Sequence, residues 1–154
     1  MSRALALAAV ASLPVHGALV PGRSLGGVHL GETAAQVRVA LGSFYGACLG
    51  CRTTTWYFTY RKFTSQGLAV ELTGGRVSAL YTLWQPPGWR APSGLQLGAV
   101  EGQVTTLAGP LEPIPCAGYS ALVRVEPAAL TAYYIVEGNL WGFGLFGHGG
   151  SPCR

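Results

Sequence analysis

Two similar stretches, GVHLGETAAQV at 27–37 and GLQLGAVEGQV at 94–104, decide the fold that we expect. They lie 67 residues apart, and Gly42 recurs as Gly109 at the same offset. A repeat of this length indicates that one structural unit occurs twice in the chain. We therefore look for the same elements after each copy.

Each copy opens with a predicted short helix. In the first copy, Thr33 and Gln36 form a capping box, in which each side chain satisfies a backbone amide of the first turn. Gly42 then supplies the left-handed residue that often ends a helix. The second copy has Val100 in place of Thr33 and carries Gly102 inside the helix, so we expect that helix to be shorter and weaker.

Strands are predicted to follow each helix, because the later segments are rich in Thr, Val and aromatic residues. The predicted strands are Thr53 to Lys62, Gly67 to Thr73, Arg76 to Trp84, Tyr119 to Glu126, Leu130 to Val136 and Asn139 to Phe146. The expected fold is therefore α+β: two tandem helix-plus-antiparallel-sheet units, 18–84 and 94–154, sharing one sheet. Between them, 85–93 is rich in Pro and is read as an extended linker.

The motif Leu30-Gly31-Glu32-Thr33-Ala34-Ala35-Gln36-Val37, ending at Leu41-Gly42, resembles the opening of the BamE/SmpA-type outer-membrane lipoproteins. It also resembles the repeats of the β-lactamase inhibitory protein, which is exported, has two such units in tandem and carries cysteines beyond each helix. The resemblance implies the same tandem plan here. Glu32, Val100 and the missing lipobox depart from the pattern, and the motif transfers no binding residue.

The N-terminus is typical of a secretory signal, with Arg3 followed by the apolar run Ala4 to Leu13 and small residues up to Gly17. We predict that 1–17 is a signal peptide and that the mature protein is extracytoplasmic, either secreted or in the cell envelope. An uncleaved anchor or a first core helix are the alternatives. The run is about half of the ~20 residues that a membrane-spanning helix needs, so we expect no integral span in the mature chain.

Four cysteines, Cys48, Cys51, Cys116 and Cys153, form an even set in a small chain with an export signal, which favours disulfides. The preferred pairing joins Cys48 to Cys51 across a four-residue turn and leaves Cys116 to bind Cys153. The two other pairings remain open. A zinc site needs a second close pair of ligands, so no metal is predicted.

The charge distribution and one glycine-rich motif argue against nucleic acid and nucleotide cofactors as partners. The net charge of +4 comes from scattered arginines, without the basic stripe that follows a phosphate backbone, so no nucleic acid is expected. The stretch at 142–147 spells GxGxxG, but 148–152 cannot form the helix that would receive a pyrophosphate. We therefore predict no cofactor.

One pattern suggests an enzyme. GRSLG at 22–26 satisfies the GxSxG nucleophile motif, with Ser24 as nucleophile and His148 as base. That motif needs a strand before it and a helix after it, and the surrounding residues do not predict either. No catalytic residue is therefore predicted, and a small secreted serine hydrolase using Ser24 and His148 is the alternative hypothesis.

The leading hypothesis is a non-enzymatic binding or structural module whose partner is a protein or the cell envelope. Alternation along 56–61 directs Trp56, Phe58 and Tyr60 to one face, and we expect that face to be the core. The other face then presents the predicted binding residues Tyr57, Thr59, Arg61, Glu71 and Arg124. Exposed aromatic and Arg side chains are common at binding surfaces, although a solvated sheet face gives the same pattern. Trp84 and Trp89 are expected to seal the junction between the units.

Overall fold

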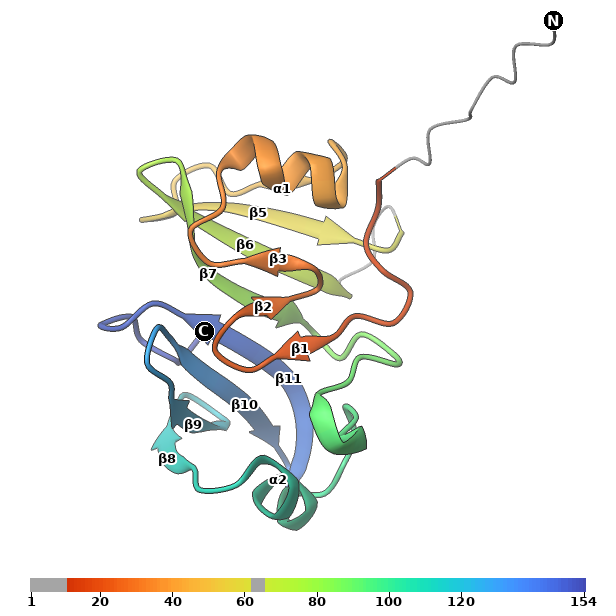
Figure 1. Ribbon diagram of the computed structural model, residues 1–154, viewed down its shortest axis with the longest axis vertical. Helices are drawn as coiled ribbons and strands as arrows, with labels where there is room; N and C mark the ends of the chain where they lie inside the picture. Colours follow the sequence, from red (N-terminus) through yellow and green to blue (C-terminus); the bar gives the residue numbers. More distant parts are fainter. Residues whose placement is uncertain (1–10, 62–65) are drawn as a thin grey trace, which may run out of the picture.

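A computed structural model describes residues 11–61 and 66–154 of the chain (Figure 1). It contains two eight-residue helices, α1 (Ala34–Leu41) and α2 (Glu101–Ala108), and a short 3-10 turn at Pro92–Gly94. The strands are β1 (Leu19–Val20), β2 (Ser24–Leu25), β3 (Val28–His29), β4 (Gly46–Ala47), β5 (Thr54–Thr59), β6 (Gly67–Thr73), β7 (Arg76–Leu83), β8 (Glu112–Pro115), β9 (Ser120–Val125), β10 (Leu130–Val136) and β11 (Asn139–Phe146).

The fold is mostly β, and the prediction of two α+β units is wrong. One antiparallel sheet has the order β4-β5-β6-β7-β11-β10-β9-β8, and a second small sheet has the order β1-β2-β3. The small sheet lies over the middle of the large one, with α1 and α2 toward its two ends (Figure 1). Each helix is only about two turns long, so the strands and not the helices dominate each half.

The sequence repeat nevertheless corresponds to a repeated backbone pattern. In the first half, the backbone of Val77 in β7 exchanges two 2.8 Å hydrogen bonds with 31–32. In the second half, Leu140 in β11 makes the equivalent bonds with 98–99, at 2.7 and 2.8 Å. Each repeat motif therefore ties the start of a helix to the last strand of its own half.

The capping box of α1 is confirmed: the amide of Gln36 donates to Thr33 Oγ1 at 3.3 Å, and the amide of Thr33 donates to Gln36 Oε1 at 2.8 Å. Helix α2 has no side-chain cap, yet it is as long as α1, so the prediction of a shorter helix is wrong. Val37 and Val104 are both fully buried beneath their helices. Packing of the apolar face sustains a short helix more than its cap does.

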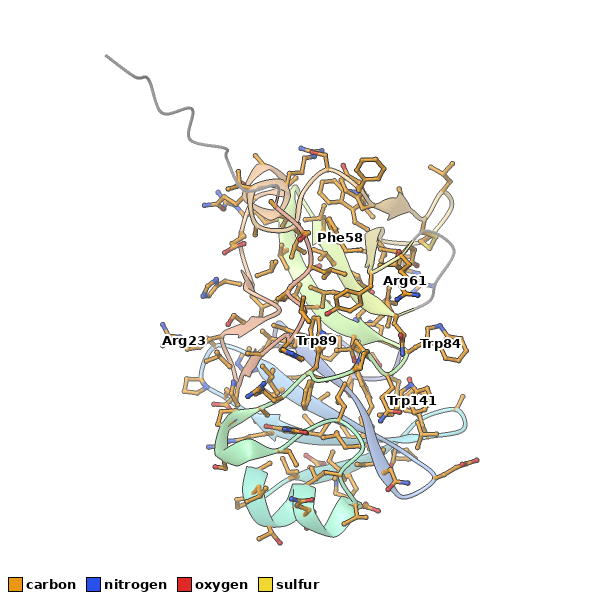
Figure 2. The ribbon with its side chains drawn as sticks, turned by 90° about the vertical axis from the view of Figure 1, so that its right-hand side faces the viewer. Arg23, Phe58, Arg61, Trp84, Trp89 and Trp141 are labelled. Atoms are coloured by element: carbon orange, nitrogen blue, oxygen red, sulfur yellow. A yellow bond between two sulfur atoms is a disulfide. The ribbon has the colours of Figure 1, made fainter. Side chains whose placement is uncertain are left out.

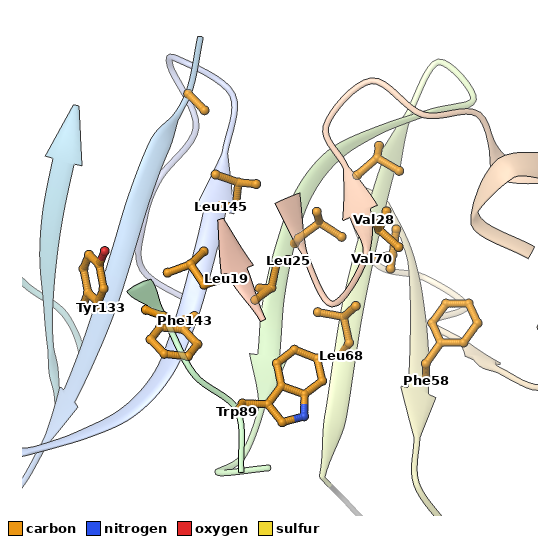
Figure 3. Packing of buried hydrophobic residues seen from close by; sticks show 14 of the residues in the cluster. Leu19, Leu25, Val28, Phe58, Leu68, Val70, Trp89, Tyr133, Phe143 and Leu145 are labelled. Atoms are coloured by element: carbon orange, nitrogen blue, oxygen red, sulfur yellow. The ribbon is translucent and has the colours of Figure 1, made fainter. Parts of the chain in front are cut away.

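A single core runs through both halves, between the large sheet and the layer above it. Leu19, Leu25 and Val28 of the small sheet point into it, toward Leu68 and Val70 of β6 and Leu145 of β11 (Figure 3). The segment 18–29 thus covers the junction of β7 and β11. The two halves therefore share one core.

Residues 11–17 pack on the domain. Leu13 is buried, the carbonyl of Pro14 accepts a hydrogen bond from the Tyr60 hydroxyl, and the carbonyl of Gly17 accepts one from the amide of Arg90 at 3.0 Å. The predicted signal begins in 1–10, outside the described residues, so it stays a prediction. No helix in the described part of the chain is long and apolar enough to cross a membrane.

Candidate functional site

The large sheet has a second face, opposite the core, with its own apolar cluster. Alternation places six buried side chains there, namely Ala79, Ala121, Val123, Ala132, Tyr134 and Phe146. Neither helix nor the small sheet covers this open face (Figure 1). Part of it is covered instead by the C-terminal segment 147–154.

That segment is fixed at several points. The disulfide Cys116–Cys153 joins it to the sheet, with a Cα–Cα distance of 5.5 Å, and the hydroxyl of Tyr134 donates to the carbonyl of Pro152 at 2.6 Å. The Arg154 guanidinium binds both carboxylate oxygens of Glu71, at 3.1 and 3.3 Å. The other disulfide is Cys48–Cys51, so the structure has the preferred pairing and no cysteine is unpaired.

Beside this segment the open face is hollowed into a cavity of about 420 Å³. It lies over the adjacent strands β7, β11 and β10, near the middle of the sheet. Its walls are mainly aromatic. The lining residues are Tyr81, Thr82, Leu83, Trp84, Tyr119, Tyr134, Val136, Trp141 and Arg154.

Trp141 reaches this cavity because of a β-bulge. Between β10 and β11 the register passes from Tyr134 opposite Gly142 to Ile135 opposite Leu140, which leaves Trp141 without a partner. Such an extra residue bends the strand and redirects a side chain. The first half has a bulge at the equivalent place, where the unpaired residue is Ser78.

Trp84 forms the other side of the cavity, directly after β7. Its backbone φ is 54°, a region that a bulky side chain rarely adopts, and its side chain is 60% exposed. Its ring lies 6.3 Å from that of Trp141, inclined at 58°. Figure 2 shows both tryptophans on one side of the molecule, with Arg23 of the β1–β2 connection on the opposite side. Trp84 therefore does not seal the junction; the fully buried Trp89 does.

Two glycines of β11 leave room at the floor of the cavity. A Cβ on Gly144 would lie 2.6 Å from the Tyr134 hydroxyl, and one on Gly142 would lie 2.3 Å from Thr82 Oγ1. Both distances are far below van der Waals contact. The GxGxxG pattern at 142–147 thus accommodates the side chains of neighbouring strands.

The ionisable groups of the cavity remain neutral or paired. Burial, reinforced by the Glu71 carboxylate, raises the pKa of Tyr81 to about 12, although Arg154 opposes the shift. Burial also raises the pKa of Tyr134. Both phenols are therefore uncharged hydrogen-bonding groups at neutral pH, and Arg154 is neutralised by Glu71. Among the described residues, no His, Cys and Glu side chains gather into a group that could hold a metal ion.

A smaller cavity of about 260 Å³ adjoins the first and shares Val136 and Trp141 with it. Its remaining lining residues are more polar, namely Gln85, Gly98, Glu137 and Asn139. Trp141 thus stands between an aromatic cavity and a polar one.

The predicted binding residues separate into two groups. Tyr57, Thr59 and Glu71 lie on the open face, as expected from the alternation, whereas Arg61 is exposed beyond the end of β5. The expectation that Arg124 shares this face is wrong. It pairs with Thr131 on the core side, and its guanidinium donates to the carbonyl of Ala108 at 3.1 Å. The sequence comparison of the two copies was out of register in this strand by an odd number of residues. Because side chains alternate along a strand, such an error assigns a residue to the opposite face.

The residues of the hydrolase alternative lack the arrangement of a catalytic pair in the described part of the chain. Ser24 is buried in the two-residue strand β2, which continues into β3 and not into a helix. His148 is exposed, and its Nε2 lies 3.0 Å from the carbonyl oxygen of Pro127. Within the described parts of the chain, no hydrogen bond joins the two side chains. The strand-turn-helix context of the nucleophile motif is therefore missing.

Neither a protein-family model nor a curated protein matches this chain, so the resemblance to BamE/SmpA-type repeats stays a prediction. Among solved structures, the chain is similar to an extracellular protein containing a SCP domain from Bacillus anthracis str. Ames. The TM-score is 0.58 at 11% sequence identity, over 77% of this chain and 44% of that one. The chain thus spans less than half of that protein, and at this identity the likeness extends to the fold alone.

Proposed function

We propose that this chain is an extracytoplasmic, non-enzymatic binding module that holds its ligand in the aromatic cavity of the open face. One observation carries the proposal: Trp84 is exposed and has a strained backbone, yet it faces Trp141 across the cavity. Strained residues concentrate at functional sites, where the surrounding structure holds them in place. A concave, mainly aromatic site with a few polar groups is the usual form of a binding pocket.

Two features support the location. The disulfides Cys48–Cys51 and Cys116–Cys153 are of a kind that persists in oxidising compartments outside the cytoplasm. In addition, the protein with the similar fold is described as extracellular. A partner in the cell envelope or the surrounding medium is consistent with both.

The test uses the four tryptophans of the chain as reporters. Nitrogen-15 labelling of tryptophan gives one indole N–H signal for each, assigned by single substitutions. The probes are cellotetraose, chitotetraose, a proline-rich peptide and an anilinonaphthalene sulfonate dye. We expect at least one probe to shift the signals of Trp84 and Trp141 while the buried Trp89 is unaffected. If no probe shifts them, the cavity is not a binding site of this kind.

The hydrolase alternative has its own measurement. A binding module has no esterase turnover, and Ser24→Ala leaves ligand binding unchanged. Turnover in the parent protein that disappears in Ser24→Ala would overturn the proposal, because loss of a nucleophile removes orders of magnitude of rate.

A further inference from the structure

We infer that the cavity between Trp84 and Trp141 binds a neutral oligosaccharide of pyranose rings with equatorial hydroxyls, an inference that rests on the function proposed above. The two rings would stack on sugar rings, and the amides of the adjoining cavity would bind sugar hydroxyls. Three features of the site lead to this ligand class: its ring faces, its amide groups and its place in the sheet.

The two tryptophan rings suit a pyranose. A sugar with equatorial hydroxyls presents axial C–H groups on both faces, and these carry the partial positive charge that the negative face of an aromatic ring attracts. Trp84 and Trp141 are inclined at 58° and do not stack on each other, so each offers a face to a ligand. Two such faces can hold two consecutive sugar rings.

The adjoining cavity supplies hydrogen-bonding groups of the required kind. Gln85 donates to the carbonyl of Leu140 over a long 3.5 Å, and Asn139 donates to the carbonyl of Glu137 at 3.4 Å. Both bonds use the amide nitrogen, and among the described residues neither amide oxygen accepts a hydrogen bond. An amide can donate and accept at once, as a sugar hydroxyl can, so the two groups are complementary.

The position of the cavity argues against an extended peptide. Peptides that add to a sheet bind along an edge strand, where backbone groups are unpaired. Here β7 pairs with β6 and β11 pairs with β10 beside the cavity, and β7 pairs directly with β11 at 79–81, so the cavity does not lie at an outer edge of the sheet. Charge argues against an anionic ligand, because Arg154 is already bound to Glu71 through both carboxylate oxygens.

The experiment compares the two tetrasaccharides with the peptide and the dye on the same labelled protein. We expect cellotetraose or chitotetraose to shift the Trp84 and Trp141 signals, and the better of the two shows whether acetamido groups contribute. Trp84→Asn and Trp141→Ala should each weaken that binding about 3- to 10-fold. The matched control is Phe44→Ala, which removes a 98% exposed aromatic ring outside the cavity and should leave the affinity unchanged.

The outcomes distinguish two claims: that the cavity is a binding site, and that its ligand is an oligosaccharide. Shifts by the peptide or the dye alone overturn the oligosaccharide inference and leave the cavity as the binding site. Binding of a tetrasaccharide that is unaffected by both tryptophan substitutions also overturns the inference. No shift by any probe overturns both. Because Trp84 is largely exposed, its variant is expected to fold, and an unchanged urea midpoint checks this.

Discussion

The two halves of the molecule share a backbone plan but differ in what they place on the open face. Both tie a repeat motif to their last strand, and both have a bulge at the equivalent position. The bulge residue is Ser78 in the first half, where its hydroxyl lies 2.9 Å from that of Thr73. It is Trp141 in the second half, where it lines the cavity. The backbone plan is therefore repeated, whereas the side chain at the bulge differs between the halves, and of the two bulge residues Trp141 lines the aromatic cavity.

The largest expected difference between the halves lies in their disulfides. Cys116–Cys153 spans 37 residues, whereas Cys48–Cys51 spans three. Loop-closure entropy predicts that replacing Cys116 and Cys153 by serine lowers the free energy of unfolding by about 3 to 4 kcal/mol. Replacing Cys48 and Cys51 by serine should lower it by about 2 kcal/mol. Urea unfolding of the two double variants measures both. If the two double variants lose equal free energy of unfolding, the entropy of the denatured chain does not determine how much each disulfide stabilises the fold.

The second prediction concerns residues 11–17, a packed segment that has no counterpart in the second half. Removal of 1–17 should lower the free energy of unfolding by about 2 to 4 kcal/mol, through lost burial of Leu13 and the lost hydrogen bond between Pro14 and Tyr60. Removal of 1–11 retains both contacts and is the control. If the two truncated proteins are equally stable, the segment contributes nothing, and cleavage after Gly17 would be without consequence.

Much of the large sheet could be predicted from sequence, because strands such as Gly67–Thr73 and Leu130–Val136 have strong local preferences and clear turns. The small sheet could not, since its strands of two residues are too short to show alternation. The cavity was missed for a related reason. Trp141 reaches it only through a bulge, and a bulge depends on cross-strand register, which one sequence does not reveal.

The helix caps provide the third prediction, with a matched change in each half. Thr33→Ala removes the capping box of α1 and should cost about 1 kcal/mol. Val100→Thr should gain up to about 1 kcal/mol, because Gln103 already occupies the position that completes the box in α2. The urea midpoints of the two variants, compared with that of the parent protein, test both predicted changes in stability. A destabilised Val100→Thr would show that packing, and not capping, limits α2.

The fourth prediction concerns the pH dependence of stability, an effect that appears only in alkaline solution. Because the folded protein raises the pKa of Tyr81 to about 12, above its usual value of 10, the neutral phenol is favoured on folding. The associated stability is fully present below about pH 10 and is lost as the pH rises toward 12. Tyr81→Phe should therefore show a shallower loss of stability over this range. Parallel curves for the two proteins would contradict the shift.

The smallest effect on stability is expected for Trp84→Asn, although the same change should weaken binding. Asn tolerates a positive φ, so the substitution relieves backbone strain of about 1 kcal/mol. It also removes the contact with Trp141, worth about 0.5 to 1.5 kcal/mol. These contributions nearly cancel, and we expect the free energy of unfolding, measured with urea, to stay within about 0.5 kcal/mol of the parent's. A loss of more than about 2 kcal/mol in the free energy of unfolding would mean that Trp84 is a packing residue. Without a ligand, an exposed tryptophan with a strained backbone can stabilise the fold only through its packing contacts.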